Sequence, residues 1–410
     1  MTVPINYGRR ISQRIFIKAN LVFSSPVVIG SQDPQDLIDL IILRDPRENK
    51  PLLPGSTMAG AIRNYLRECK YGFRSDGSGI DPIPWQDLLM GYAKDQNGEE
   101  SWLITTDSLS EHKIVSLRDS LSMDPVTQTG EPGGKFDYEI LETGASFPIR
   151  FELQLPDEKQ NEILQAAALA LLGLELGEIS FGAKKSRGFG QCQVTNWQIW
   201  DFDLSTFEGL RSWLSWDWDN PPLAGTYDSH IENALGVSVS GIDARKRCTI
   251  TATLAIKDSL QIRSEKGGPK DPDYSHLKSE RSGGVQVPIL SGPSIAGSLK
   301  QRCVAILNTL EHPQKDDLIK KLFGFAEAKT AKASDLQVSE VEIQGINPTE
   351  WVQTRIKIDR FLGGAYQSAL FDEMPLFPCG DNNVTINLEI QEPLDREIAL
   401  LLHALRDLFL

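Results

Sequence analysis

The chain has 410 residues, 40% hydrophobic and 24% charged, which indicates a soluble globular protein too long for one ordinary core. No apolar run could span a bilayer, no signal peptide opens the chain, and the five cysteines and five histidines lack zinc-ligand spacing. We therefore expect a cytoplasmic protein without structural zinc. The net charge of −14 disfavours nucleic acid as a partner unless basic side chains gather locally.

In chain order, alternating apolar residues predict strands and a 3.6-residue period predicts helices. The first half is predicted as strand, helix, strand, strand, helix and strand, at residues 14–23, 57–69, within 102–117, 147–155, 158–172 and 191–200. Ser56 is placed to cap the first helix. This βαββαβ order is that of the ferredoxin-like unit, which also underlies RRM domains.

A glycine-rich loop at residues 181–190 precedes the last of these strands and carries Lys184, Lys185 and Arg187. Glycines let a phosphate backbone approach closely, and the cations attract it. The loop lacks the GxxxxGK[ST] pattern, so we do not expect a nucleoside triphosphate site. Alternatively, the loop is only a turn between helix and strand.

An acidic segment at residues 201–245 follows and contains Trp213, Trp216 and Trp218. Exposed tryptophans stack on bases or dock neighbouring subunits. We favour the other interpretation, in which these tryptophans pack the two halves of the chain together.

The second half repeats the first. Residues 51–63 are similar to residues 288–300, and Leu88-Leu89-Met90-Gly91 corresponds to Lys321-Leu322-Phe323-Gly324. The repeat predicts a strand, a helix, a strand and a helix at residues 249–256, 294–307, 384–390 and from 393 onward. No counterpart of the glycine loop and last strand follows before Leu410, so either the chain is cut short or a partner supplies that edge.

Each copy places a glycine-containing turn before its first helix, and amides at such helix starts bind phosphate. Ser56 and Thr57 are therefore candidate phosphate ligands, as is Ser294 in the second copy. Arg63 in the first helix, and Lys300 at the matching position, add a positive charge to each copy.

The Pro54-Gly55-Ser56 turn, the Leu-Leu-Met-Gly and Leu-Phe-Gly marks and the loop at residues 182–190 together resemble the RAMP superfamily of CRISPR-associated proteins. The likeness is greatest to the backbone subunit of type III effector complexes, here in tandem, over residues 11–200 and 248–410. It implies an α+β fold of two tandem modified RRM (ferredoxin-like βαββαβ) modules with inserted thumb loops, the second lacking its final glycine loop and strand. The modules would span residues 1–200 and 246–410, joined by a Trp-rich linker at 201–245.

The resemblance also implies function. Such a subunit binds guide RNA and complementary target RNA together with other CRISPR effector subunits, in the cytoplasm and away from membranes. Its thumbs would wedge into the guide and target duplex. The candidate thumbs, residues 123–138 and 358–374, contain glycines and little regular periodicity; alternatively, they are mobile surface loops. Their marker residues are Asp124, Pro125, Asp359, Arg360 and Gly363.

In many members of the family a loop aspartate cuts target RNA with a divalent metal. Asp39 fits, because it precedes an apolar run that ends in a basic residue and Asp-Pro. Asp273 is its counterpart if Leu277-Lys278 matches Leu43-Arg44, and Asp271 is the competing choice. The two carboxylates are the candidate catalytic and metal-binding residues, with Mg²⁺ or another divalent cation.

Alternatives remain for each of these residues. Asp39 lies near Asp33 and Asp36, which also fit an exposed acidic loop. His276 is either a general base or an ordinary loop histidine. For the whole protein, the rival functions are a guide-RNA scaffold without catalysis and a guide-processing endoribonuclease, the latter weakened by the few suitably placed histidines.

Overall fold

The computed structural model describes residues 9–31, 40–94, 97–111, 115–124, 127, 129–265, 268, 271–281, 284–327, 330–347 and 350–408. Asp39 and Pro125 lie outside these residues. The described residues form eight α-helices and several mostly antiparallel sheets. None of these helices is long and apolar enough to cross a membrane.

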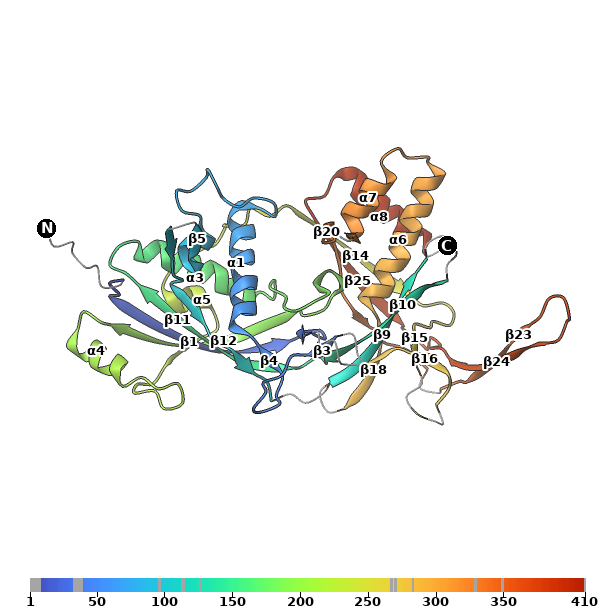
Figure 1. Cartoon of the computed structure of the whole chain (residues 1–410), viewed down its shortest axis with the longest axis horizontal. Coiled ribbons are helices and arrows are strands. Elements are labelled where there is room, and N and C mark those ends of the chain that lie inside the picture. Colours follow the sequence, from blue (N-terminus) through green and yellow to red (C-terminus); the bar gives the residue numbers. More distant parts are fainter. Residues whose placement is uncertain are drawn as a thin grey trace.

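Figure 1 shows two bodies side by side, each built on its own sheet. We call residues 13–203, with residues 226–235 that pack on them, the first module, and residues 247–407 the second module. Each has its own cluster of buried apolar side chains. The predicted mixture of helices and antiparallel strands is confirmed.

The first module is built on one antiparallel sheet. Its strands are ordered β13-β12-β1-β11-β7, and their bounds are β1 (Gln13–Phe23), β7 (Leu103–Thr105), β11 (Ser146–Leu155), β12 (Cys192–Asp203) and β13 (Thr226–Asp228). Side chains alternate across a strand, so Ile15, Ile17 and Leu21 of β1 point to one face and are at most 4% exposed. The predicted long strands are confirmed, and β13 is an addition at the edge.

Helices cover one face of this sheet, with bounds α1 (Gly55–Tyr71), α2 (Trp85–Met90), α3 (Gln160–Glu175) and α5 (Ile231–Leu235). Most of α3 is buried alanine and leucine, because α1, α2, α5 and the sheet all pack against it. The prediction that Ser56 caps α1 is wrong. Pro54 occupies the N-cap position, and Ser56 is the second residue of the helix and is exposed.

The tryptophans of the acidic segment cover the opposite face of the same sheet, beside α4 (Phe207–Leu214). Trp216 stacks on Phe16 of β1 with ring centres 4.4 Å apart, and Trp218 meets Phe16 edge-on at 5.4 Å. Trp213 lies under the Arg14 guanidinium at 4.5 Å. The prediction that these side chains join the two modules is therefore wrong, since all three contact the first module.

The second module repeats this plan with fewer strands. Its sheet has the order β14-β25-β21, from β14 (Arg247–Ala255), β25 (Asn383–Gln391) and β21 (Leu336–Val338). Its helices are α6 (Gly292–Thr309), α7 (Lys315–Phe323) and α8 (Asp395–Asp407). Within the described residues, β14 pairs on one side alone, whereas β1 of the first module is paired on both.

The repeat extends to single hydrogen bonds. Ser101 Oγ donates to the carbonyl oxygens of Leu89 and Leu103, at 3.2 and 2.5 Å. Ser334 Oγ makes the matching bonds in the second module, at 2.5 and 2.6 Å. Gly91 and Gly324, which end α2 and α7, both adopt positive φ, 69° and 74°. The two copies can therefore be aligned residue by residue.

A long hairpin is inserted in each module. The hairpins are β9 (Val115–Met123) with β10 (Gly130–Leu141), and β23 (Gln353–Ile358) with β24 (Ala365–Met374). The second hairpin projects from the molecule at the right of Figure 1. The predicted thumb segments thus lie in regular strands rather than in irregular loops, because their glycines fall at turns and a bulge while alternation governs the rest.

Short strands complete the two modules. In the first they are β2 (Gly30–Ser31), β3 (Ile41–Ile42), β4 (Leu52–Leu53), β5 (Tyr92–Lys94), β6 (Asn97–Glu99) and β8 (Ser108–Leu109). In the second they are β15 (Arg263–Glu265), β16 (Tyr274–His276), β17 (Lys278–Arg281), β18 (Val285–Leu290), β19 (Phe325–Glu327), β20 (Thr330–Lys332) and β22 (Val341–Glu342).

The glycine loop of the first module packs against the second module. Its single 3-10 turn, η1 (Lys185–Arg187), lies beside α6 and β21. Arg187 Nη2 donates to the Phe323 carbonyl oxygen at the end of α7, at 3.1 Å. Gly188 has φ 83°, and a Cβ built on it would lie 2.8 Å from the Val338 carbonyl oxygen. Any side chain there would push the modules apart.

A buried ion pair adds to this interface. Arg118 Nη1 of β9 lies 2.6 Å from Glu340 Oε2 of the second module, and the side chains are 4% and 6% exposed. Nearby, Ser279 Oγ donates to Glu142 Oε2 at 2.6 Å. Charges buried this deeply are stable only when paired, so the contact fixes how the modules sit together.

Candidate functional site

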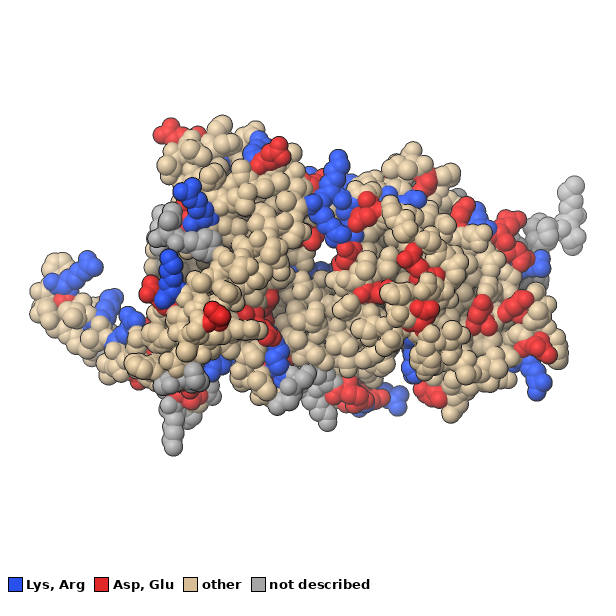
Figure 2. All heavy atoms as spheres, turned by 180° about the vertical axis from the view of Figure 1, so that it is seen from behind, with Lys and Arg blue, Asp and Glu red and all other residues tan. Residues whose placement is uncertain are grey.

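A cleft of about 910 Å³ lies between the two modules. One wall is the face of α1 that begins at Ser56 and Thr57, together with Lys184, Lys185 and Ser186 of the glycine loop. The other wall is formed by residues of β21 and β25 of the second module, by the two residues Ala333 and Ser334 before β21, and by the segment that joins the modules. Figure 2, from behind, shows Lys and Arg gathered where the modules meet.

The first turns of the α1 wall are open because their residues are small; Asn64, Tyr65 and Glu68 line the cleft further along the helix. Thr57, Gly60 and Ala61 line the cleft, and Gly60 has no atom within 4 Å of where a Cβ would stand. The amides at the helix start are largely in use. The Gly55 N–H donates to Asp107 Oδ1 at 2.7 Å, and the Thr57 N–H donates to the Pro54 carbonyl at 3.0 Å. The exposed Ser56 and the hydroxyl of Thr57 remain as ligand donors on this wall.

Lys184 is held in place by aromatic rings. Its backbone is left-handed, with φ 58°, and its Nζ lies 3.4 Å from the Tyr138 ring centre and 4.4 Å from that of Phe136. Burial, together with the charge of Arg118, lowers the pKa of Lys184 to about 8. The ammonium still carries most of its charge at neutral pH and pairs with no carboxylate of the described residues.

The other two cations of the loop point in different directions. Lys185 is exposed and lines the cleft, again without a carboxylate partner in the part of the chain that the structure describes. Arg187 instead turns into the module interface, where burial lowers its pKa and its guanidinium meets the end of α7. The predicted trio is therefore divided into two cleft lysines and one interface arginine.

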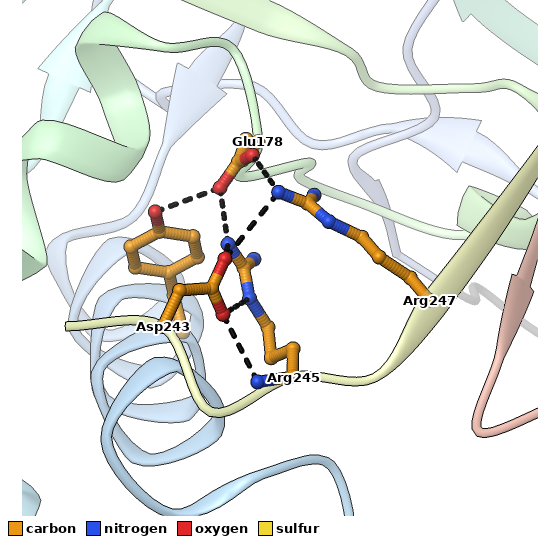
Figure 3. Close-up of polar contacts among 5 residues, drawn as sticks. Glu178, Asp243, Arg245 and Arg247 are labelled. Atoms are coloured by element: carbon orange, nitrogen blue, oxygen red, sulfur yellow. Dashed lines mark hydrogen bonds and ion pairs between the residues drawn. The ribbon is translucent and has the colours of Figure 1, made fainter. Parts of the chain in front are cut away.

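Two arginines that sequence analysis did not select also border the cleft, and Figure 3 shows them bound to acids. Glu178 lies 2.6 Å from Arg245 and 2.7 Å from Arg247, and Asp243 lies 2.8 and 3.4 Å from the same two guanidinium groups. Tyr65 Oη donates to Glu178 at 2.8 Å. Burial alone would raise the pKa of Glu178, but the arginines outweigh it and hold that pKa below its usual value.

This cluster is structural, because its charges neutralise one another. It ties the end of α3 to the segment that enters β14 and so fixes the back of the cleft. The cations left to attract an anion are the glycine-loop lysines. The run Arg245-Lys246-Arg247, directly before a predicted strand, was the signal in the sequence that could have identified the pair.

The remaining predicted RNA-binding residues lie elsewhere. Arg63 pairs with Asp87, and its Nη1 donates to the Gly91 carbonyl at 2.7 Å, so it holds the end of α2. Ser294 accepts a hydrogen bond from Ser291 at the start of α6, near the glycine loop. Lys300 is exposed on α6 and does not line the cleft.

The two copies, when aligned on the structure, favour Asp273 over Asp271. Leu40 forms a parallel bridge with β10, and Tyr274 forms the matching parallel pair with β24. The residues directly before them are Asp39 and Asp273. Asp39 itself lies outside the described residues.

Asp273 is exposed, and its Oδ2 accepts the Asp372 N–H at 3.0 Å. His276 lies nearby in sequence but is 1% exposed. Its Nε2 lies 2.9 Å from the Ile289 carbonyl, its Nδ1 accepts the Ile262 N–H at 3.2 Å, and burial lowers its pKa. A neutral histidine with both nitrogens engaged does not serve as a general base.

The tip of the β23–β24 hairpin is apolar and basic. Phe361 is fully exposed and Leu362 is 85% exposed, while Asp359 accepts the N–H groups of both and so shapes the turn, in which Gly363 has φ 64°. Arg360 is exposed at the same tip, and Figure 2 shows basic side chains spaced along this hairpin. In the other hairpin, Asp124 Oδ1 accepts the Thr127 N–H at 3.1 Å.

Comparison with known proteins identifies a family whose model matches the chain and a named protein that is similar in sequence. A family model described as the RAMP superfamily matches residues 20–193 and 267–410, and each matched region contains one copy of the repeat. The CRISPR system Cms endoribonuclease Csm3 of Streptococcus thermophilus is similar over 192 residues at 24% identity. The similarity spans 43% of this chain and 86% of that protein.

Proposed function

The chain belongs to the RAMP superfamily, and we propose that it is a subunit of a type III CRISPR ribonucleoprotein that holds guide RNA along its two modules. The observation that carries the proposal is the cleft between the modules, lined by Lys184, Lys185 and the open face of α1. A single strand of RNA is held by cations that meet its phosphates and by backbone that it can approach closely. The charges and small residues of this cleft fit both needs despite the net charge of −14.

Each module is proposed to be a modified RRM, at residues 1–200 and 246–410 with the linker at 201–245. The strand order β12-β1-β11-β7, with α1 and α3 on one face, supports this for the first module. The second follows the same plan in β14, β25 and β21. Sequence specificity would then come from base pairing with the guide, so base-reading side chains are not required.

The two hairpins are the proposed thumbs. Exposed Phe361 and Leu362 form an apolar wedge of the kind that unstacks neighbouring bases, and Arg360 beside them would meet a phosphate. A strand splayed at that point presents its backbone to a nearby carboxylate.

Cleavage of the bound target RNA at Asp39 and Asp273 is the second part of the proposal. The similarity to a protein named as an endoribonuclease supports it. The described residues contain no group of three His, Cys, Asp or Glu side chains that could hold a metal by themselves. One exposed carboxylate such as Asp273, completed by phosphate oxygens and water, is however a ligand set that Mg²⁺ accepts. Bound there, the cation would polarise the scissile phosphate.

The cutting experiment uses the complex assembled with its guide, a complementary RNA and Mg²⁺. Asp39→Ala and Asp273→Ala should each remove one product and leave binding intact, while Asp271→Ala serves as the matched control. Unchanged products in both variants would show that the protein is a scaffold without catalytic activity. Such a scaffold would still bind guide and target RNA beside other effector subunits in the cytoplasm.

The RNA-binding part is tested separately. Protein co-expressed with its guide should carry RNA, seen as a raised ratio of absorbance at the nucleic acid and protein maxima. Lys184→Ala combined with Lys185→Ala should lower that ratio, and Lys300→Ala, which lies outside the cleft, should not. Protein that emerges free of RNA would refute the proposed function.

A further inference from the structure

Helix α4 lies at the end of the molecule that is far from the second module (Figure 1). Two of its residues face the first module. A Cβ built on Gly209 would stand 2.0 Å from the Asp203 carbonyl oxygen, and the Trp213 ring lies 4.5 Å from the Arg14 guanidinium. The Thr206 hydroxyl caps the helix by accepting the Gly209 N–H at 3.1 Å. These contacts hold α4 on the first module, yet no residue of the helix is buried.

The outer side of α4 carries an apolar stripe. Phe207, Leu210 and Leu214 follow one another at a spacing of three and four residues, which places them on one side of a helix, and they are 79%, 38% and 70% exposed. A helix this short is not stable alone in water and depends on the packing of an apolar face. The described residues leave the stripe uncovered, so the fold does not account for these three side chains.

The surroundings of the stripe are acidic. Residues 201–228 contain six acidic residues and one arginine, a net charge of −5. Asp203, Glu208 and Asp217 are exposed and pair with no cation in the part of the chain that the structure describes. Asp219 alone of the six forms an ion pair there, with Arg150 at 3.1 Å. Unlike the acids bound to Arg245 and Arg247, most of these carboxylates are therefore free to attract a positively charged partner.

This charge restricts what can cover the stripe. RNA phosphates and anionic lipid headgroups would be repelled. A second copy of this chain that docked through the same surface would bring two segments of net charge −5 together, which is unfavourable. A polypeptide segment that combines apolar side chains with lysine or arginine satisfies both the stripe and the acids. An amphipathic helix presents its apolar side chains at matching intervals and can pack along α4.

We propose that α4 is a docking site for a basic amphipathic helix of a separate protein. The apolar side chains of that helix cover Phe207, Leu210 and Leu214, and its lysines or arginines meet Glu208 and the neighbouring aspartates. None of these residues lines the cleft between the modules, so the inference does not rest on the proposed function.

The first test places the photo-crosslinking residue p-benzoylphenylalanine at Leu214 of the full chain, expressed in its native cell, purified with its partners and irradiated. We expect a crosslink to a lysine- or arginine-rich segment of a different polypeptide, with apolar residues at helical spacing. The control carries the crosslinker at Val285, an exposed apolar position of the second module. A crosslink from position 214 to RNA, to lipid, to a second copy or to an acidic segment, or none above the control, would overturn the inference.

The second test measures the affinity of the full chain for a synthetic peptide with the crosslinked sequence, by fluorescence anisotropy. Phe207→Ala combined with Leu214→Ala should weaken binding about tenfold or more, because it removes the exposed anchors. Glu208→Gln combined with Asp217→Asn should also weaken it, and the asparagine keeps an acceptor for the Asp219 N–H. Affinity should decrease with salt, and Val285→Ala should leave it unchanged.

Undiminished peptide binding by either double variant would refute docking on α4. Thermal unfolding of the same variants verifies that they are folded, as expected for changes at exposed side chains. The RNA content of the purified protein reports on the proposed function. RNA-loaded protein that gives no crosslink from position 214 would contradict the docking inference alone, and RNA-free protein that gives the crosslink would contradict only the proposed function.

Discussion

The Nζ atom of Lys184 lies 3.4 Å from the centre of the Tyr138 ring, so the glycine loop is fastened to the base of the β9–β10 hairpin. Burial and the neighbouring Arg118 lower the pKa of Lys184 to about 8, whereas an exposed lysine titrates near about 10.4. This lysine therefore loses its charge at a pH where an ordinary exposed lysine keeps its own.

We expect the affinity for single-stranded RNA to fall a few-fold between about pH 7 and about pH 9 at constant salt, because Lys184 ceases to attract phosphate. Lys184→Arg should reduce this dependence, since a guanidinium stays charged. Fluorescence anisotropy measures both. An equally steep decline in the arginine variant would assign the effect to another group.

The lowered pKa of Lys184 has the opposite effect on the stability of the fold: stability should increase with pH while RNA affinity decreases. Between about pH 8 and about pH 10.4 the unfolded chain binds more protons at this position than the folded chain, so the free energy of unfolding should rise with pH there. In the Lys184→Met variant this rise should be smaller, as measured by chemical denaturation across that range.

Glu178→Gln should destabilise the protein by about 2 kcal/mol, because it leaves Arg245 and Arg247 without their shared carboxylate in a half-buried cluster. The contribution of Glu178 should be lost only in acid, since the pKa of Glu178 is held below its ordinary value of about 4.3. Thermal unfolding measures the change. Asp157→Asn, which breaks an exposed pair with Arg10, is the control and should have no measurable effect.

Trp216→Ala should cost about 3 kcal/mol, because the indole stacks on Phe16 and packs against the sheet of the first module. Affinity for RNA, measured under conditions where the variant remains folded, should be unchanged. Phe207→Ala, at a side chain 79% exposed on neighbouring α4, is expected to leave stability unaltered. A loss of RNA affinity without a loss of stability would restore base stacking as the role of Trp216.

Replacing Phe361 and Leu362 by serine should leave thermal stability within about 0.5 kcal/mol, since both side chains are exposed at the tip of the β23–β24 hairpin. If the hairpin is the proposed thumb, cleavage of the complementary RNA in the assembled complex should decrease, because the proposed apolar wedge would be lost. Val285→Ser, at another exposed apolar position, provides the control. Normal cleavage by the double variant would contradict the role of this hairpin as a thumb.

Local patterns predicted the framework of the fold. Alternation in residues 14–23 located β1, and the alanine- and leucine-rich run located α3, because these patterns record which side chains face a core. The repeat predicted the second module for the same reason. Ser56 was misplaced as a cap, since a favourable residue type does not by itself fix the helix start.

Local sequence patterns could not predict contacts between residues that are far apart in the sequence. Glu178 meets Arg245 and Arg247 across 67 and 69 residues, and Arg118 meets Glu340 across 222. The tryptophans were assigned to the wrong surface, because their spacing shows that they are buried together but not which sheet buries them. Proximity in sequence groups Arg187 with Lys184. In the structure the η1 turn separates them, so that Arg187 contacts the second module and Lys184 lines the cleft.

Gly188 and Gly292 let backbone meet backbone where the modules join. Packing at that level depends little on side-chain identity, so the surfaces on either side are free to diverge while the stacking geometry persists. The polypeptide that runs from β12 to β14 then fixes the order of the two unlike modules. If the two modules were separate polypeptides, they could associate in either order. Because they belong to one polypeptide, the first module always precedes the second.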